Sequence, residues 1–467
     1  MKIFKLSLLL IVLCCLTTIA KGQNNYKVSF FIHEYEYDSI FIEGFCGSKN
    51  LRMDSIKVSK DGGFHWIAKD YPMGMYMVKS KKGDLFSFVL EQSKDFSIEI
   101  YDSGEFFVKN SPENDAYFLY QKENKKCQSA MYYYKIKANE QGANVDSLRN
   151  DILNTIDSFN VFQKSFFKTY PTNLITVVFD GMEQTAPAYF FNNGKVIPEK
   201  QAEYNFYYRT HYWNRFHFTD KRILYTPYFI KQFNSYITEA TAQEPDSICT
   251  AIDDFIKTAD SKGGKEYADY IIAWYLDYLP QMPFSFNEMI YSHLVNTYID
   301  RAATYLMPSV IEYHKGNLKK IEPFLPGKLM PNIILADFNK VPHSLYSVKK
   351  NYTVLYFFAS TCESCKKNLE DLTNFYNDFK DKYDVEIFSI DIDQDYAICK
   401  ARQEADPYPW IVTHANEAEL RPYNFQLDHT PTLYILDKDK RILNKTAIYS
   451  HVKQTIENAQ NMASPKE

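Results

Sequence analysis

The chain has 467 residues, a formal net charge of -5 and basic residues that are scattered along its length. This length exceeds what one ordinary hydrophobic core occupies and predicts two or three domains. The negative net charge argues against a nucleic-acid partner, because such a partner would be held through phosphate contacts. Tyrosine and phenylalanine are abundant, with 38 and 35 residues, whereas glycine is scarce with 15. We interpret this composition as large aromatic cores in a globular protein.

Residues 1–22 have the pattern of a signal peptide. Two lysines precede an apolar stretch at residues 6–19, and Ala20-Lys21-Gly22 fits a small-x-small cleavage site. The stretch is too short for a membrane span, and we predict no transmembrane segment after its removal. We therefore expect an exported protein of the periplasm or cell envelope. The bulky residues before Cys14 and Cys15 argue against lipid anchoring, the less favoured alternative.

Residues 23–110 are predicted to form an N-terminal all-β sandwich. Apolar and polar residues alternate in YKVSFFIHE, SIFIEGF and FSIEIY, as in half-buried strands. Turn signals such as Asp61-Gly62-Gly63 separate these segments. Short strands at regular spacing are typical of a sandwich.

Residues 111–325 are predicted to form a mostly α-helical central region. Apolar residues recur there at spacings of three and four, and prolines divide the pattern into several helices. The aromatic stretch YNFYYRTHYWNRFHF raises the question of a sugar- or peptide-binding site. Its spacing suits a helix packed on two sides, so we favour a core or a domain interface.

Residues 326–467 alternate between strand and helix patterns and predict an α/β fold. TVLYFFA and VEIFSIDI have the composition of buried strands, and CKKNLEDLTNFYNDFKDKY has helical spacing. PTLYILD and RILNKTAI are predicted to form a β-hairpin that turns at residues 438–440, and HVKQTIENAQ a closing helix.

Cys362 and Cys365 lie where the strand TVLYFFA gives way to the helix. Thiols three residues apart on a first helical turn are close enough to bridge. The first thiol faces the unpaired N–H groups at the positive end of the helix, which favours its thiolate. Because the thiolate is the attacking species in disulfide exchange, we assign Cys362 as the nucleophile and Cys365 as the resolving thiol.

A CxxC pair can also be half of a metal site or a structural disulfide. A zinc site needs three or four ligands, and the sequence has neither a second CxxC nor a ligand-spaced histidine pair, so we expect no metal. A purely structural disulfide is the other alternative. Closing so short a loop contributes little entropy, which makes it a poor stabiliser.

Thr430-Pro431-Thr432 precedes a predicted strand, at the place where a cis proline would face the dithiol. The backbone of Thr430 could then hold an extended substrate segment as an added strand. We therefore assign Thr430 and Pro431 to substrate binding.

The order and spacing of these motifs resemble the thioredoxin fold, specifically its secreted TlpA/ResA-like branch. The matching residues are Gly327, Pro331-Asn332, Phe357-Phe358-Ala359-Ser360, the cysteine pair and Thr430-Pro431-Thr432. The resemblance covers the C-terminal residues and implies thiol-disulfide oxidoreductase activity without a bound cofactor. Upstream, the sequence is similar to a small β domain and a helical region of unknown function that accompany such domains.

The chain departs from this family near the cysteines. Thr361 and Ser364 stand where the family usually has tryptophan and proline, and Tyr356 stands where thioredoxin carries a buried acid. The proton acceptor for Cys365 is therefore unassigned. Glu363 places a negative charge beside Cys362 and should oppose its ionisation, with the following lysines as an offset. We accordingly expect a reductant or isomerase, with Thr361, Glu363 and Ser364 modulating the reactive sulfur.

Two further residues near the site have open interpretations. Cys399 is either a third thiol that receives a disulfide from the pair or, as we favour, a core thiol. Trp410 either covers the active-site face or belongs to the core. We favour buried thiols also for Cys46, Cys127 and Cys249.

The sequence thus predicts an exported enzyme that exchanges disulfides with cysteine-containing exported proteins. Its electrons would come from an upstream thiol donor. The alternative is a binding module with a thioredoxin fold, without catalysis, in a cell-envelope assembly.

Overall fold

The computed structural model describes residues 25–33, 39–47, 49–101, 103–140, 145–183, 186–192, 195–281, 285–423, 425, 427 and 430–463. The predicted signal peptide lies outside these residues. The chain divides into two compact units: Met1–Gln243 with Thr250–Ile271, and Glu244–Cys249 with Ile272–Glu467. Helical residues belong to both units, so the domain boundaries placed after residues 110 and 325 stay predictions.

The described N-terminal strands form two four-stranded sheets that share one core. Their orders are β4-β1-β7-β8 and β3-β2-β5-β6. Val28 and Trp66 of the first sheet and Ile42 and Phe88 of the second belong to the same buried cluster, which confirms the sandwich. The strands are β1 (Tyr26–Ile32), β2 (Ser39–Cys46), β3 (Lys49–Lys57), β4 (Gly63–Ala68), β5 (Gly74–Ser80), β6 (Gly83–Leu90), β7 (Asp95–Ile100) and β8 (Phe106–Lys109). The short strand β8 was not among the predicted ones.

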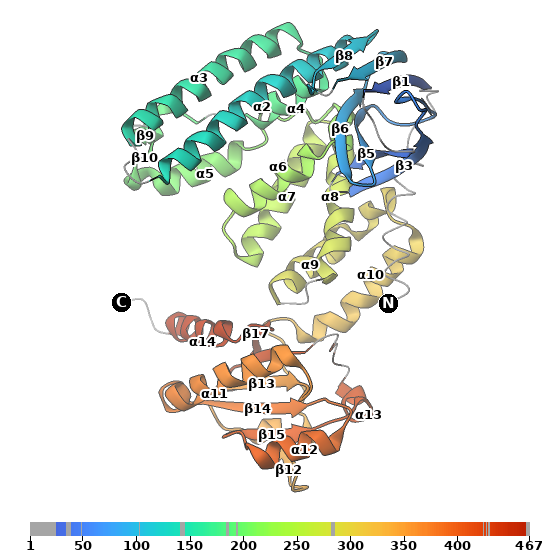
Figure 1. Ribbon diagram of the computed structural model, residues 1–467. Helices are drawn as coiled ribbons and strands as arrows, with labels where there is room; N and C mark the ends of the chain where they lie inside the picture. The colour runs from blue at the N-terminus through green and yellow to red at the C-terminus, as the bar shows by residue number, and fades with distance from the viewer. Residues whose placement is uncertain are drawn as a thin grey trace. The chain divides into compact units, whose positions relative to one another are not determined.

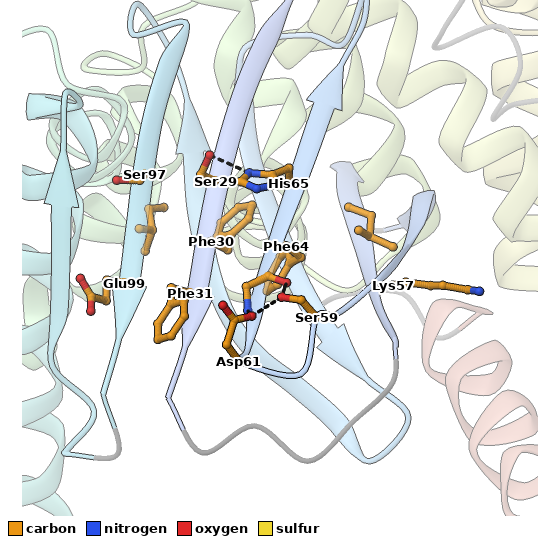
Figure 2. A pocket seen from close by; sticks show the side chains of 13 residues that line it. Ser29, Phe30, Phe31, Lys57, Ser59, Asp61, Phe64, His65, Ser97 and Glu99 are labelled. Atoms are coloured by element: carbon orange, nitrogen blue, oxygen red, sulfur yellow. Dashed lines mark hydrogen bonds between the residues drawn. The ribbon is translucent and has the colours of Figure 1, made fainter.

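A pocket lies on this sandwich and is lined from β1, β3, β4 and β7 and from the turn before β4 (Figure 2). Ser29 and His65, which are paired across β1 and β4, are joined by a hydrogen bond of 2.9 Å between Oγ and Nδ1. Its lining residues include no cysteine, so thiol chemistry is not expected there.

Helices dominate the described chain between the sandwich and the C-terminal domain (Figure 1). Ser111 caps the first of them, accepting the Asn114 N–H on its hydroxyl, and Gly263 with a φ of 80° separates α7 from α8. The helices are α2 (Pro112–Ala138), α3 (Val145–Thr169), α4 (Leu174–Met182), α5 (Gln201–His211), α6 (Tyr228–Glu239), α7 (Pro245–Ser261), α8 (Lys265–Tyr278), α9 (Ser285–Tyr298) and α10 (Pro308–Ile321).

The aromatic stretch at residues 204–218 divides into two parts. Tyr212, Trp213, Phe216 and Phe218 are buried, as the core interpretation predicts. In contrast, α5 has no fully buried residue, and Phe206 on it is 64% exposed. The second part of the stretch therefore supplies the core, whereas the helix at its start lies near the surface.

The described C-terminal strands form a five-stranded sheet of order β15-β14-β13-β16-β17. β13 is parallel to β14, which is parallel to β15, and antiparallel to β16. The elements are β13 (Tyr352–Phe358), α11 (Glu363–Tyr383), β14 (Val385–Asp391), α12 (Tyr396–Ala405), β15 (Ile411–His414), α13 (Glu417–Leu420), β16 (Thr432–Leu436), β17 (Ile442–Thr446) and α14 (Ser450–Ala463), after a short hairpin of β11 (Ile334–Ala336) and β12 (Pro342–Ser344). The predicted hairpin around residues 438–440 is confirmed, whereas β15 was not predicted.

Alternate side chains of β13 pack into different cores on the two faces of the sheet. Tyr356 and Phe358 join α11 and α14 on one face, and Leu355 and Phe357 join the other core. Trp410 belongs to the first core, where its Nε1 donates a hydrogen bond of 3.1 Å to Ser389 Oγ. The structure thus decides the open question on this residue in favour of the core.

The second unit also contains α9, which contacts the edge strand β17. Ser285 Oγ accepts the Lys445 backbone N–H at 2.6 Å, and Lys445 Nζ lies 2.6 Å from Glu288 Oε1. Both side chains of this ion pair are 5% exposed. This buried pair connects α9 to the five-stranded sheet of the C-terminal domain.

Candidate dithiol site

Cys362 occupies the N-cap position of α11, directly after the loop that leaves β13. Its backbone is extended (φ -80°, ψ 116°), and its sulfur accepts the Cys365 N–H at 3.3 Å. The side chain therefore replaces a missing partner of the first helical turn, as N-cap residues do. The positive end of the helix dipole stabilises a negative charge on this sulfur.

The thiol of Cys362 has the environment of a reactive cysteine. It is partly exposed, and its sulfur lies 3.2 Å from Ser364 Oγ. Desolvation opposes ionisation, but hydrogen bonds from Cys365 and Ser364 outweigh it and lower the pKa of Cys362 from 9.0 to about 7. A substantial thiolate fraction near neutral pH follows, and the thiolate is the nucleophile in disulfide exchange.

Cys365 lies behind Cys362 and is fully buried at 0% exposure. Burial, followed by the hydrogen bond with Cys362, raises the pKa of Cys365 from 9.0 to about 11. No disulfide joins the two sulfurs in this structure. The pair thus contains one partly exposed thiol with a lowered pKa and one buried thiol with a raised pKa, and the roles of nucleophile and resolving thiol stay predictions.

The loop before β16 reaches the nucleophile. Phe357 of β13 pairs with Thr432 of β16, and this register brings the preceding residues to the end of β13. The Thr430–Pro431 peptide bond is cis, as expected, and the Thr430 carbonyl oxygen is 3.8 Å from Cys362 Sγ. The backbone of Thr430 is therefore placed beside the reactive sulfur.

Tyr356 and Glu363 lie near the cysteines, but Tyr356 is not placed to accept a proton and Glu363 is not a strong charge beside Cys362. Tyr356 is buried, its hydroxyl donates to the Cys365 carbonyl oxygen at 3.5 Å, and burial raises its pKa far above the usual range. It therefore does not take up the Cys365 proton. Glu363 is 87% exposed and pairs with Lys366 at 2.8 Å. Solvent and this lysine screen its charge.

Sequence reasoning missed Asp391 and Asp393, whose side chains contact the residues just before Cys362. The available signal was the run DIDQD, which begins within the last two residues of the predicted buried strand VEIFSIDI. Carboxyl ends of neighbouring parallel strands meet at one edge of a sheet, so these carboxylates were placed to approach the cysteine loop.

Cys399 is 1% exposed, and burial together with the Asp391 carboxylate raises its pKa from 9.0 to about 12. A buried thiol with this pKa is unreactive, which favours the core interpretation. Cys46 is also buried, whereas Cys127 and Cys249 are partly exposed. Within the described part of the chain, no three histidine, cysteine, aspartate or glutamate side chains are grouped as metal ligands.

Comparisons with known proteins relate the C-terminal domain to redox enzymes. Residues 326–445 match the AhpC/TSA family, and residues 195–312 match a domain of unknown function, DUF5106. The thiol-disulfide oxidoreductase ResA of Bacillus cereus is 25% identical over 134 residues, which are 28% of this chain and 75% of that protein. ResA of Bacillus thuringiensis shows the same identity and coverage.

Solved structures resemble parts of the chain. A thioredoxin-like protein from Bacteroides caccae is 21% identical, with a TM-score of 0.42, and the match covers 59% of this chain and 98% of that one. The thioredoxin domain of a thiol-disulfide oxidoreductase from Bacteroides vulgatus is 22% identical, with a TM-score of 0.27, covering 29% and 96%. The C-terminal domain thus has a thioredoxin-like fold and is similar in sequence to thiol-disulfide oxidoreductases, and the DUF5106 match precedes it.

Proposed function

We propose that the protein exchanges disulfides with cysteine-containing proteins through Cys362 and Cys365. One observation carries this proposal: an accessible sulfur at the start of α11 accepts the N–H of a buried second cysteine and lies 3.8 Å from the Thr430 carbonyl oxygen. A structural disulfide would need neither an exposed thiol with a pKa of about 7 nor a backbone edge beside it.

The reaction transfers two electrons from the Cys362–Cys365 dithiol to the substrate disulfide and proceeds in two displacements. The Cys362 thiolate attacks one sulfur of a substrate disulfide, forming a mixed disulfide and releasing the other sulfur as a thiolate. Cys365 then attacks Cys362 Sγ, which releases the second substrate thiol and leaves a Cys362–Cys365 disulfide. Before this second attack the Cys365 proton passes to the substrate thiolate that the first displacement released, so that a thiolate is again the attacking species. An upstream thiol protein restores the dithiol.

We further propose that the protein works outside the cytoplasm, in the periplasm or cell envelope, as a reductant or isomerase. The signal-like pattern of residues 1–22 supports export. None of the described helices has the length and apolar character needed to cross a membrane. A pKa of about 7 for Cys362 supports the reductive direction, because strongly oxidising members of this fold have far more acidic thiols. Thr430 and Pro431 are proposed to align the substrate segment.

Insulin reduction by the mature protein tests the proposal, with Cys362→Ser as the control. We expect turnover with a thiol donor by the unmodified protein and none by the variant. Equal rates for the two proteins would reject catalysis and favour the binding module. Cys365→Ser should accumulate mixed disulfides with substrate proteins, and their identification by mass spectrometry would name the substrates.

A further inference from the structure

Two carboxylates at the end of β14 and just after it, Asp391 and Asp393, hold the loop between β13 and α11. Ser360 donates its N–H to Asp391 Oδ1 at 3.3 Å and its hydroxyl to Oδ2 at 2.5 Å. The next residue, Thr361, donates its N–H and its hydroxyl to Asp393 Oδ2, at 3.0 and 2.5 Å. The two residues that precede Cys362 are therefore each attached to one carboxylate through both backbone and side chain.

The sheet register explains why these groups meet. Phe358, the last residue of β13, pairs with Asp391, the last residue of β14, and the Ile392 N–H donates to the Phe358 carbonyl oxygen at 2.8 Å. The loop that starts after Phe358 must pass over the carboxylates. Because both strands end at the same edge of a parallel pair, this contact is set by the fold and not by neighbouring residues in the sequence.

The buried carboxyl group of Asp391 needs hydrogen-bond donors. The side chain is 1% exposed, and a buried carboxylate without partners is strongly unfavourable. Ser360 supplies two of its donors, and the Asp393 N–H adds another at 3.1 Å. Ser360 therefore cannot leave its place without taking two hydrogen-bond donors from a buried carboxyl group. The exposed Thr361 is held by Asp393, whose pKa lies below the ordinary value mainly because of the Thr361 hydroxyl, so the carboxylate is ionised at neutral pH.

We propose that Asp391 and Asp393 are positioning residues that keep Cys362 at the N-cap of α11, with its sulfur on the Cys365 N–H. The importance of this positioning for catalysis rests on the proposed disulfide exchange, but the effect of the two aspartates on the position of Cys362 does not. The orientation of the peptide units on both sides of Thr361 determines where Cys362 lies relative to the first turn of α11. When Asp393 releases Thr361, these units are free to rotate, and the sulfur loses the hydrogen bonds that stabilise its thiolate.

Charge and position have opposite effects on the Cys362 thiol, so they can be separated. A nearby carboxylate disfavours the thiolate, and removing only its charge lowers the pKa of Cys362. Losing the N-cap position raises that pKa. Charged or titratable groups lie around the loop on every element packed against it: Tyr356 on β13, Glu363, Cys365 and Lys366 on α11, Asp391 at the end of β14 and Asp393 after it, Asp395 at the N-cap of α12 and Cys399 on that helix, and His414 on β15.

The test is the pH dependence of iodoacetamide alkylation of Cys362 in the mature protein, followed by peptide mass spectrometry. Thr361→Val keeps the shape and the Asp393 charge but removes the hydroxyl. We expect the pKa of Cys362 to rise by about one unit, which lowers the alkylation rate near pH 6 about tenfold. Thr361→Ser should restore the rate to within about twofold of the unmodified protein, because it restores the hydroxyl.

Asp393→Asn and Asp395→Asn form a matched pair. Each removes one carboxylate charge from the same loop, but Asp395 caps α12 and does not contact Ser360 or Thr361. We expect Asp393→Asn to raise the pKa of Cys362 and Asp395→Asn to leave it unchanged or lower it. Circular dichroism would verify folding; Thr361 is exposed, so its substitution does not disturb a core.

Positioning is refuted when Thr361→Val alkylates like the unmodified protein, or when Asp393→Asn lowers the pKa as Asp395→Asn does. The measurement needs no disulfide substrate, so it is independent of the insulin assay. If the unmodified protein reduces insulin but the pKa of Cys362 in Thr361→Val is unchanged, the positioning proposal alone is overturned. If the unmodified protein does not reduce insulin but Thr361→Val still raises the pKa of Cys362, the proposed function alone is overturned.

Discussion

The buried ion pair between Glu288 and Lys445 allows a quantitative test of how α9 is joined to the redox domain. Its Nζ and Oε1 atoms are 2.6 Å apart, and both side chains are 5% exposed. Removing one partner of such a pair leaves an uncompensated buried charge and costs about 3–5 kcal/mol of folding free energy. We expect Glu288→Gln to fall near the lower limit, about 3 kcal/mol, because the amide oxygen can still accept a hydrogen bond.

Replacing both partners should cost far less than replacing one. In the Glu288→Leu/Lys445→Met double variant no charge is buried, so the expected loss is less than about 1 kcal/mol. The single variants Glu288→Leu and Lys445→Met complete the double-mutant cycle, and each should cost about 3 kcal/mol or more. The coupling free energy of the cycle is then about 5 kcal/mol or more. Asp300→Asn provides the control within the same unit: its partner Lys315 lies 3.5 Å away, and the two side chains are 91% and 40% exposed. We expect a loss below about 1 kcal/mol there.

Hydrogen exchange of the β17 amides, measured by mass spectrometry during urea unfolding, reports the stability of the strand that carries Lys445. Faster exchange in Glu288→Gln than in Asp300→Asn, with recovery in the double variant, would agree with the prediction. A loss below about 1 kcal/mol in Glu288→Gln, or a double variant whose loss equals the sum of both single losses, would refute the reasoning.

Three further predictions concern the thiols and the residue beside them. Alkylation of Cys362 should rise with pH and reach half its maximal rate near pH 7, because only the thiolate reacts; a midpoint near 9, the ordinary value, would contradict the hydrogen-bonded N-cap. Cys399, with a pKa of about 12, should remain unlabelled by N-ethylmaleimide at neutral pH until the protein is unfolded, and rapid labelling in the native state would show that it is accessible. Tyr356→Phe should change the insulin-reduction rate by less than about threefold, because a hydroxyl that donates to a carbonyl takes no part in moving the proton. A loss of about a hundredfold would assign it a catalytic role.

Much of the candidate site was predictable because it depends on local pattern. An apolar strand, a CxxC pair and a helical repeat follow one another directly, so the place of Cys362 at a helix start could be read from adjacent residues. The cis Thr430–Pro431 bond was also expected, although it lies far along the chain, because the resemblance to the thioredoxin fold links it to the pair. The short strands β8 and β15 were missed, since four residues carry too little alternation to be recognised.

The amino-acid sequence by itself determined the fold class of the three regions and the place of the cysteine pair at the start of a helix, because strand alternation, helical spacing and helix capping are properties of short segments. Only the tertiary structure decided that Trp410 is a core residue, that α9 is tied to β17 through Lys445, and that Asp391 and Asp393 hold the residues before Cys362. These contacts depend on which strands pair and in which register, and pairing is settled by the packing of side chains that are distant in the sequence.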